Sequence, residues 1–166
     1  MTSIQPELWV ETPAEAIAFY EAAFGATVLH RVGDGDDIVA QLGVGDAAFW
    51  VAATSKTMKR LSPRAIDGAT SRTLLLVKDP DRVVRQAVAA GATESSPVGN
   101  EHGWRLGRII DPFGHEWEIG APLGAWPPSY AAREDRGHAN AATAGNQLVK
   151  LITTVRPAPG RRPVGV

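Results

Sequence analysis

Hydrophobic and polar positions follow a helical period in two segments of the chain. Over residues 13–24 and 80–90, apolar side chains recur three or four positions apart, which is the spacing of one helical face. A helix-capping residue and a proline begin each segment, and a glycine follows each one. Thr12 and Glu15 also have the spacing of a capping box. The pattern predicts two helices with these apolar faces: Ala16, Phe19, Tyr20, Ala23 and Phe24, then Val83, Val84, Ala87 and Val88.

Shorter apolar runs on both sides of the helices predict strands. One run precedes each helix and three follow it, separated by turns rich in glycine and aspartate. The two halves also share the order Val-x-(Thr or Asp)-Pro, helix, Gly-Ala-Thr, with the prolines at positions 13 and 80. Such self-similarity indicates a repeated βαβββ unit. The expected strands are 4–10, 26–32, 37–43, 47–53, 72–77, 92–98, 104–110 and 115–120.

The repeat divides the chain into one two-module domain and an extension. Residues 1–121 are expected to form the domain, and residues 122–166 match neither module. Basic residues, proline and glycine dominate the end of the extension, so we expect part of it to be disordered. Within it, residues 146–155 are apolar enough to add a strand or to pack on a partner. The expected boundaries inside the domain are about 3–53 for the first module, 54–70 for a linker and about 71–121 for the second module.

Composition and charge exclude several classes of protein. The net charge of −1 gives no sign of binding to nucleic acid or to an anionic membrane. The chain has no cysteine, which excludes disulfides, thiolate metal sites and a cysteine nucleophile. The longest run of leucine, isoleucine or valine is "LLLV", and no signal-peptide pattern is present. We therefore expect a cytoplasmic protein whose partners include neither nucleic acid nor membrane.

Two motifs give the repeat a family resemblance. "AFYEAAFGA" in the first helix and "DPFGHEW" before the last strand, within a duplicated βαβββ frame, resemble the glyoxalase / bleomycin-resistance / dioxygenase superfamily, also called vicinal oxygen chelate proteins. The motifs look most like those of its PhnB-like branch. The resemblance covers about residues 3–121 and implies an α+β fold, in which two tandem modules form a curved mixed sheet around a cavity. It also implies a homodimer that binds a small molecule.

The resemblance implies four metal-ligand positions, on the first and last strand of each module. In this chain they correspond to Gln5, a position near Phe49 or Trp50, Arg72 and Glu118. Gln5 and Glu118 are ligand types, whereas the aromatic residues are not. Arginine stays protonated and does not bind a divalent cation. The expectation is therefore no cofactor and no complete metal site, with a divalent metal on Gln5 and Glu118 as the alternative.

The stretch "DPFGHEWEIG" contains a histidine and two glutamates close together. Side chains alternate between the two faces of a strand, so Glu116 and Glu118 share one face and His115 points to the other. His115 is therefore expected to be a hydrogen-bonded structural residue on the side of Trp117. With Arg72 and Glu118 both assigned to the cavity, we expect their charged groups to lie within roughly 8 Å of each other, close enough to pair.

The same alternation completes the expected ligand-binding set. Its members are Gln5, Glu7, Trp9, Trp50, Arg72, Leu74, Trp104, Glu116 and Glu118. One hypothesis is a binding protein of the antibiotic-resistance type, whose tryptophans stack on a flat organic ligand while Arg72 holds its carbonyl or acid group. The other is a metal-dependent isomerase, lyase or dioxygenase-type enzyme that uses Gln5 and Glu118, with Glu118 as the candidate catalytic base. The sequence leaves open whether a reaction is catalysed and whether His30 or His102 enters the cavity.

Overall fold

A computed structural model describes residues 2–127 of the chain. Residues 128–166 lie outside this part, and they include the segment 146–155 that was expected to add a strand or to pack on a partner. Residues 2–123 belong to one compact unit. In residues 2–127, no helix is long and apolar enough to cross a membrane. The elements of the first module are β1 (Glu7–Val10), α1 (Pro13–Phe24), β2 (Thr27–Val32), η1 (Gly35–Asp37), β3 (Val39–Val44) and β4 (Ala47–Ala53). After η2 (Arg64–Ile66) come β5 (Arg72–Leu76), α2 (Pro80–Ala89), β6 (Thr93–Glu101), β7 (Trp104–Ile110) and β8 (Glu116–Pro122).

The strands form two four-stranded mixed sheets, one from each module. Their orders are β1-β4-β3-β2 and β5-β8-β7-β6, so the second sheet repeats the arrangement of the first. In each sheet the first strand of the module runs parallel to the last one, and the other neighbours are antiparallel. The expected α+β fold with two tandem βαβββ modules is confirmed.

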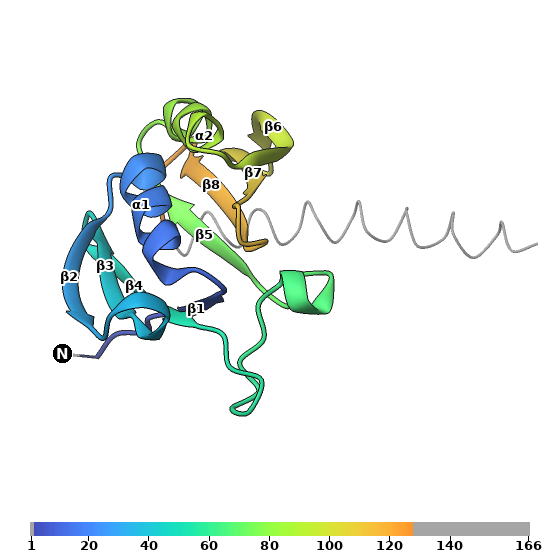
Figure 1. Cartoon of the computed structure of the whole chain (residues 1–166). Coiled ribbons are helices and arrows are strands. Elements are labelled where there is room, and N and C mark those ends of the chain that lie inside the picture. Colours follow the sequence, from blue (N-terminus) through green and yellow to red (C-terminus); the bar gives the residue numbers. More distant parts are fainter. Residues whose placement is uncertain (1, 128–166) are drawn as a thin grey trace, which may run out of the picture. The chain divides into compact units, whose positions relative to one another are not determined.

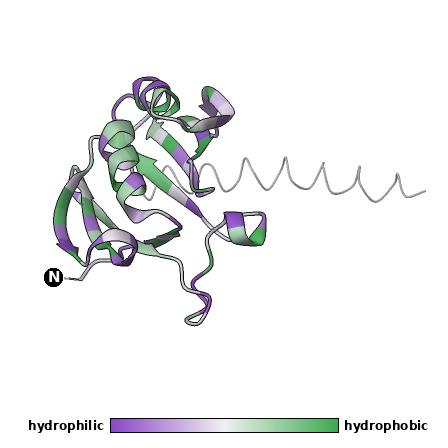
Figure 2. Ribbon diagram, viewed as in Figure 1, coloured by the Kyte–Doolittle hydropathy of each residue, from purple (hydrophilic) through white to green (hydrophobic). Residues whose placement is uncertain are grey.

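Helix α1 packs against both sheets and joins the two modules (Figure 1). The ring of Tyr20 on this helix lies 5.1 Å from that of Phe49 in the first sheet and 5.6 Å from that of Trp117 in the second, measured between centroids. All three rings are buried, with Tyr20 fully so. Hydropathy agrees with this arrangement, because α1 is mostly hydrophobic whereas α2 carries many hydrophilic residues (Figure 2). One hydrophobic core is therefore shared by the two modules.

A buried carboxylate fixes the turn that precedes β8. Asp111 is 3% exposed, and its two oxygens accept four hydrogen bonds. Oδ2 accepts from the Tyr20 hydroxyl at 2.6 Å and from the Trp117 indole at 3.0 Å. Oδ1 accepts from the backbone N–H groups of Phe113 and His115, both at 2.9 Å. The carboxylate thus links a helix of the first module to the β7–β8 turn of the second.

The residues that precede the two helices make different side-chain contacts. Asp79 caps α2, because its side chain accepts from the Arg82 backbone N–H at 3.0 Å. Thr12 makes no such bond, and its hydroxyl donates to the Glu15 carboxylate at 2.8 Å. The capping box expected at Thr12 is therefore wrong. Helix α1 ends at left-handed Gly25, as expected, since this conformation favours glycine.

The segment between the modules packs on the domain through its second half. Ser62 is fully buried, and its hydroxyl donates to Glu11 at the end of the first strand. Pro63 lies so close to Gly114 that a Cβ at this glycine, whose φ is +90°, would be only 3.0 Å from the proline Cβ. The sequence indicated only a linker here, since composition does not reveal where a loop packs. Strand β8 also continues to Pro122, two residues beyond its expected end.

We expect the Tyr20→Phe substitution to lower the free energy of unfolding at neutral pH by about 1.5–3 kcal/mol, because it removes a buried hydrogen bond to a carboxylate. Burial, followed by the charge of Asp111, raises the pKa of Tyr20 well above 10.0. A phenol with a raised pKa in the folded state contributes stability that is fully present below its unfolded pKa and declines above it. Urea unfolding should therefore show a steeper loss of stability above about pH 10 in the wild type than in the variant. Equal slopes would contradict this account of Tyr20.

Candidate functional site

Strand alternation gives each sheet one face towards the helices and one open face. On the helix side lie buried residues such as Leu8, Val51 and Ile119. We call the opposite side of the first sheet the first open face and that of the second sheet the second open face. Register and hydrogen bonds assign Gln5, Glu7, Trp9, Gln41 and Trp50 to the first open face. The second open face comprises Arg72, Leu74, Leu76, Glu101, Trp104, Arg108, Ile110, Glu116 and Glu118.

Gln5 is the centre of a hydrogen-bond cluster on the first open face. Its Oε1 accepts from the Gln41 side chain at 2.7 Å and from the Trp50 indole at 2.9 Å. The His30 ring lies 6.2 Å from the Trp50 ring between centroids, so this histidine sits beside the cluster. Phe49 is buried towards α1, and Trp50 is therefore the residue at the fourth-strand position of this face.

Glu7 and Trp9 form a second contact on the same face. The Trp9 indole donates to Glu7 Oε1 at 2.8 Å. The Trp9 backbone carbonyl lies 3.1 Å from His115 Nε2, which holds this histidine against the edge of the first sheet. His115 also donates its backbone N–H to Asp111, and it has no part in the Glu118 cluster. The hydrogen bond expected of this side chain is present. His102 lies in the β6–β7 turn, with a positive φ of 50°.

Five charged side chains form a continuous ion chain across the second open face. Arg72 pairs with Glu116 at 3.0 Å and with Glu118 at 3.5 Å. Arg108 pairs with Glu118 at 2.7 Å and with Glu101 at 3.3 Å. The expected contact between Arg72 and Glu118 is present, and both Glu116 and Glu118 share the face, as strand alternation predicted.

Arg108 is the functional candidate that sequence reasoning missed. It lies directly opposite Glu118 in the β7–β8 register, and its guanidinium is closer to that carboxylate than the Arg72 guanidinium is. The hydrogen bond to Glu118 raises the pKa of Arg108 above its usual range. Pairing the two strands of this hairpin around the "DPFG" turn would have indicated the contact.

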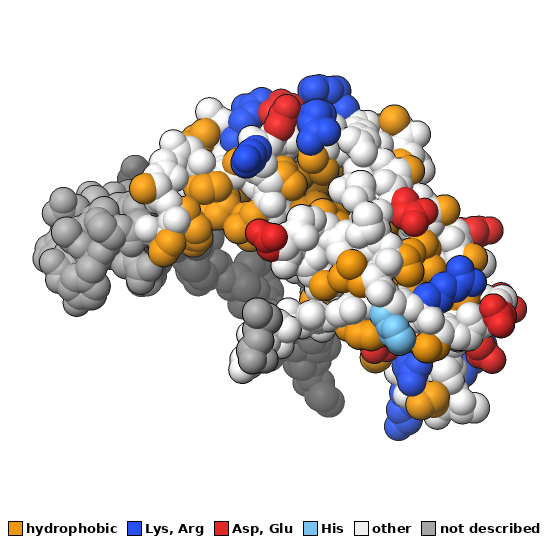
Figure 3. All heavy atoms as spheres, turned by 90° about the vertical axis from the view of Figure 1, so that its left-hand side faces the viewer, with side chains coloured by type: hydrophobic (Ala, Val, Ile, Leu, Met, Phe, Trp, Pro, Cys, Tyr) orange, Lys and Arg blue, Asp and Glu red, His pale blue; other side chains and the backbone are white. Residues whose placement is uncertain are grey.

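The ion chain is open to solvent in the single chain. The side chain of Arg72 is 45% exposed and that of Glu116 is 37% exposed, whereas Glu118 is 20% exposed. Large hydrophobic residues on the same face are also exposed, with Leu74 at 48% and Ile110 at 36%. In the space-filling view, hydrophobic patches reach the surface between charged side chains (Figure 3). The expectation of a pair inside a closed cavity is therefore not met within one chain.

The expected ligand-binding residues are divided between several hollows. Gln5 and Leu74 line a pocket of about 350 Å³ between the modules. Glu7 and Trp9 line a smaller one of about 140 Å³ beside the linker, and Glu116 lines another of about 250 Å³. The hydrogen bonds of Gln5 and Trp50 stay on the first open face, and those of Arg72 stay on the second. The hydrogen bonds thus group these residues by sheet, although one pocket is lined from both sheets.

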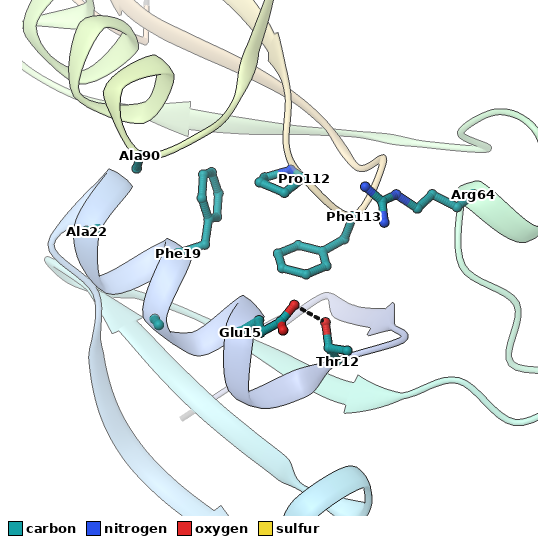
Figure 4. Close-up of a pocket in the computed structure, with 9 residues that line it drawn as sticks. Thr12, Glu15, Phe19, Ala22, Arg64, Ala90, Pro112 and Phe113 are labelled. Carbon is teal, nitrogen blue, oxygen red and sulfur yellow. Dashed lines mark hydrogen bonds between the residues drawn. The ribbon is translucent and has the colours of Figure 1, made fainter.

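A further pocket of about 400 Å³ lies on the helix side, away from both open faces. Figure 4 shows Phe19 of α1 and Phe113 of the β7–β8 turn beside each other in its lining, with ring centroids 6.2 Å apart. Glu15, which accepts from the Thr12 hydroxyl, lies at one part of its rim and Arg64 at another. It contains none of the expected ligand-binding residues.

The residues at the four implied ligand positions do not fit a divalent cation. Gln5 Oε1 already accepts two hydrogen bonds, and Glu118 Oε2 accepts from two guanidinium groups. Trp50 and Arg72 occupy the other two positions, and neither side chain offers a lone pair to a metal. Within residues 2–127, no three His, Cys, Asp or Glu side chains are grouped so that they can hold a metal ion.

A sequence profile of the glyoxalase/bleomycin resistance protein/dioxygenase superfamily matches residues 3–119. The chain belongs to this superfamily. It is 34% identical over 127 residues to an uncharacterized protein of Mycobacterium bovis, an alignment that covers 73% of this chain and 84% of the relative.

Two solved structures of similar architecture extend the comparison. A gene product of Arabidopsis thaliana has a TM-score of 0.57 and 27% identity, covering 72% of this chain and 98% of its own. TioX from a Micromonospora species has a TM-score of 0.56 and 25% identity, covering 74% of this chain and 100% of its own. Nearly the whole length of each solved chain is thus matched by about three quarters of this chain.

We expect Arg72→Ala in this glyoxalase-like domain to lower the free energy of unfolding by less than about 1 kcal/mol, because exposed ion pairs contribute little. Glu118 keeps its closer partner, Arg108, in this variant. Chemical denaturation of the wild type and the variant measures the difference. A loss above about 3 kcal/mol, the range for a buried pair that loses one partner, would mean that the ion chain is covered in solution.

Proposed function

We propose that this protein is a cytoplasmic, homodimeric member of the PhnB-like branch of its superfamily, and that it binds a small, flat organic ligand without a metal. The observation that carries the proposal is the ion pairing of Glu118. This residue is the strongest metal-ligand type at the four implied metal positions. Its carboxylate is paired with the Arg108 and Arg72 guanidinium groups. A carboxylate held by two fixed cations has little tendency to recruit a third.

Aromatic and polar groups on the first open face support binding of a flat molecule. The indole of Trp50 is oriented by its hydrogen bond to Gln5, and that of Trp9 by its bond to Glu7. Fixed indoles offer stacking surfaces, and their immobilisation lowers the entropy that a ligand loses on binding. The nearby polar side chains of Gln41 and Gln5 are suited to fixing the orientation of such a ligand.

Exposed hydrophobic residues on the open faces support a homodimer. Leu76 on the second open face is 51% exposed, and Leu29 and Val32 on the first sheet are 57% and 51% exposed. Several large apolar residues exposed on the open faces are consistent with an interaction surface. We propose that the first open face of one copy covers the second open face of its partner, and that the ligand lies between them. A two-fold axis would then create two equivalent sites.

The direct test is a titration with acridone, a neutral flat tricycle, followed by tryptophan fluorescence. We expect saturable quenching, and we expect Trp50→Ala to weaken binding by about threefold to tenfold, as loss of one stacking contact implies. Trp50→Phe should retain most of the affinity, since it keeps an aromatic face. Quenching that is unchanged in Trp50→Ala would place the ligand elsewhere.

Elemental analysis of protein purified without chelators tests the absence of a metal. We expect far less than one divalent ion per chain, because Trp50 and Arg72 stand at two of the implied ligand positions. Near one zinc, nickel, manganese or iron per chain would reject this part of the proposal. It would favour the metal-dependent isomerase, lyase or dioxygenase-type enzyme that uses Gln5 and Glu118.

Light scattering at micromolar concentration tests the dimer. We expect twice the mass of the chain for the wild type and a monomer for Leu76→Glu, because a charge on the covered face would have to be buried. Val88→Glu is the matched control, since Val88 is 40% exposed on α2, away from both open faces, and should leave the dimer intact. A monomeric wild type would contradict the proposal.

A further inference from the structure

We propose that the ligand of this protein is a flat organic cation, such as a protonated aromatic amine or amidine. This inference deepens the proposed function and rests on it, because it assumes that the two open faces bind the ligand together. It depends on the distribution of charges over these faces and on the hydrogen bonds that already occupy them.

Carboxylates outnumber cations on the second open face. Along the ion chain the order is Glu116, Arg72, Glu118, Arg108 and Glu101, so each guanidinium lies between two carboxylates. The three glutamates and two arginines leave this face with one net negative charge. Two of the negative groups, Glu116 and Glu101, stand at the ends of the ion chain, where each pairs with a single cation among residues 2–127.

Most guanidinium nitrogens of the two arginines already donate to these carboxylates. Arg72 donates from Nε and Nη2 to Glu116 and from Nη1 to Glu118, so all three of its nitrogens are engaged. Arg108 donates from Nε to Glu118 and from Nη2 to Glu101. An anionic ligand would have to approach these cations beside the carboxylates and would be repelled by them. The expectation that Arg72 holds an acid group of the ligand is therefore not what this geometry favours.

The carboxylates, in contrast, retain acceptor capacity. All hydrogen bonds that Glu116, Glu118 and Glu101 accept within residues 2–127 go to their Oε2 atoms, and their Oε1 atoms accept none there. A carboxylate has about four lone-pair sites, so the Oε1 atoms of Glu116 and Glu101, which each pair with one guanidinium, can accept from a donor group on a ligand. The second open face thus presents a row of acceptors.

The first open face adds another negative charge and two aromatic surfaces. Glu7 uses Oε1 to accept from the Trp9 indole. Trp50 and Trp9 are partly buried and held in place, and an organic cation is attracted to the face of an indole ring. Stacking and charge therefore favour the same chemical class on both faces.

Three tricycles of similar size test the inference by fluorescence titration of the full chain at neutral pH. They are 9-aminoacridine, which is cationic, acridone, which is neutral, and acridine-9-carboxylate, which is anionic. We expect 9-aminoacridine to bind at least about tenfold more tightly than acridone, and the carboxylate to bind more weakly than acridone. Raising the salt concentration should weaken the binding of 9-aminoacridine more than that of acridone.

Isosteric variants test whether a carboxylate on each open face causes the preference for 9-aminoacridine over acridone. Glu7→Gln on the first open face and Glu116→Gln on the second should each reduce the preference for 9-aminoacridine over acridone by about threefold, since each removes one charge. Glu7→Gln keeps an oxygen that can accept from the Trp9 indole, so folding should be unaffected. Glu21→Gln is the matched control: Glu21 is exposed on α1, on the helix side, and its loss should leave the preference unchanged.

The outcomes separate this inference from the function on which it rests. Saturable acridone binding that is equal to or tighter than 9-aminoacridine binding would overturn the cation preference and leave the flat-ligand function standing. A preference for the cation that Glu21→Gln reduces as much as Glu7→Gln does would mean non-specific attraction and would also overturn the inference. Failure of all three tricycles to bind would reject both.

Discussion

The hydrogen bonds to the Asp111 carboxylate hold the two modules in their present relation. The group is almost completely buried, and it accepts from Tyr20 in the first module and from Trp117 in the second. A buried carboxylate is tolerated only when its lone pairs are satisfied, so every one of these donors has to stay in place. The same carboxylate shapes the turn from which β8 starts, through the backbone N–H groups of Phe113 and His115. The direction in which Glu116 and Glu118 point therefore depends on this contact.

Placing α1 against both sheets has a direct effect on where a ligand can bind. The helix uses the apolar side of each sheet, and Tyr20 touches rings from both of them. The open faces stay uncovered by this helix, and they carry the ion chain and the two ordered tryptophans. None of the pockets of about 350, 140 and 250 Å³ contains both sets of residues. For this reason the proposed site requires a second copy.

The sequence predicted those features that depend on local periodicity. Strand alternation placed Glu116 and Glu118 on one face and His115 away from them, and the contacts of these residues agree. Features that depend on the pairing of strands or on the packing of a loop against a distant residue were missed. The Arg108–Glu118 contact follows from the pairing of β7 with β8, which a single strand does not reveal. The burial of Ser62 depends on the distant Glu11 carboxylate, and composition alone suggested an exposed linker.

The second half of the linker packs on the domain, and it therefore fixes one end of the loop that the first half forms. Ser55 and Arg60 pair through their backbones and close a small hairpin, just before the segment in which Ser62 is anchored. Met58, at the tip of this hairpin, is 63% exposed. The chain is thus fastened on both sides of a short external loop, by β4 before it and by Ser62 after it. A peptide tag or a fluorescent reporter inserted at Met58 would extend this loop outward without passing through the shared core.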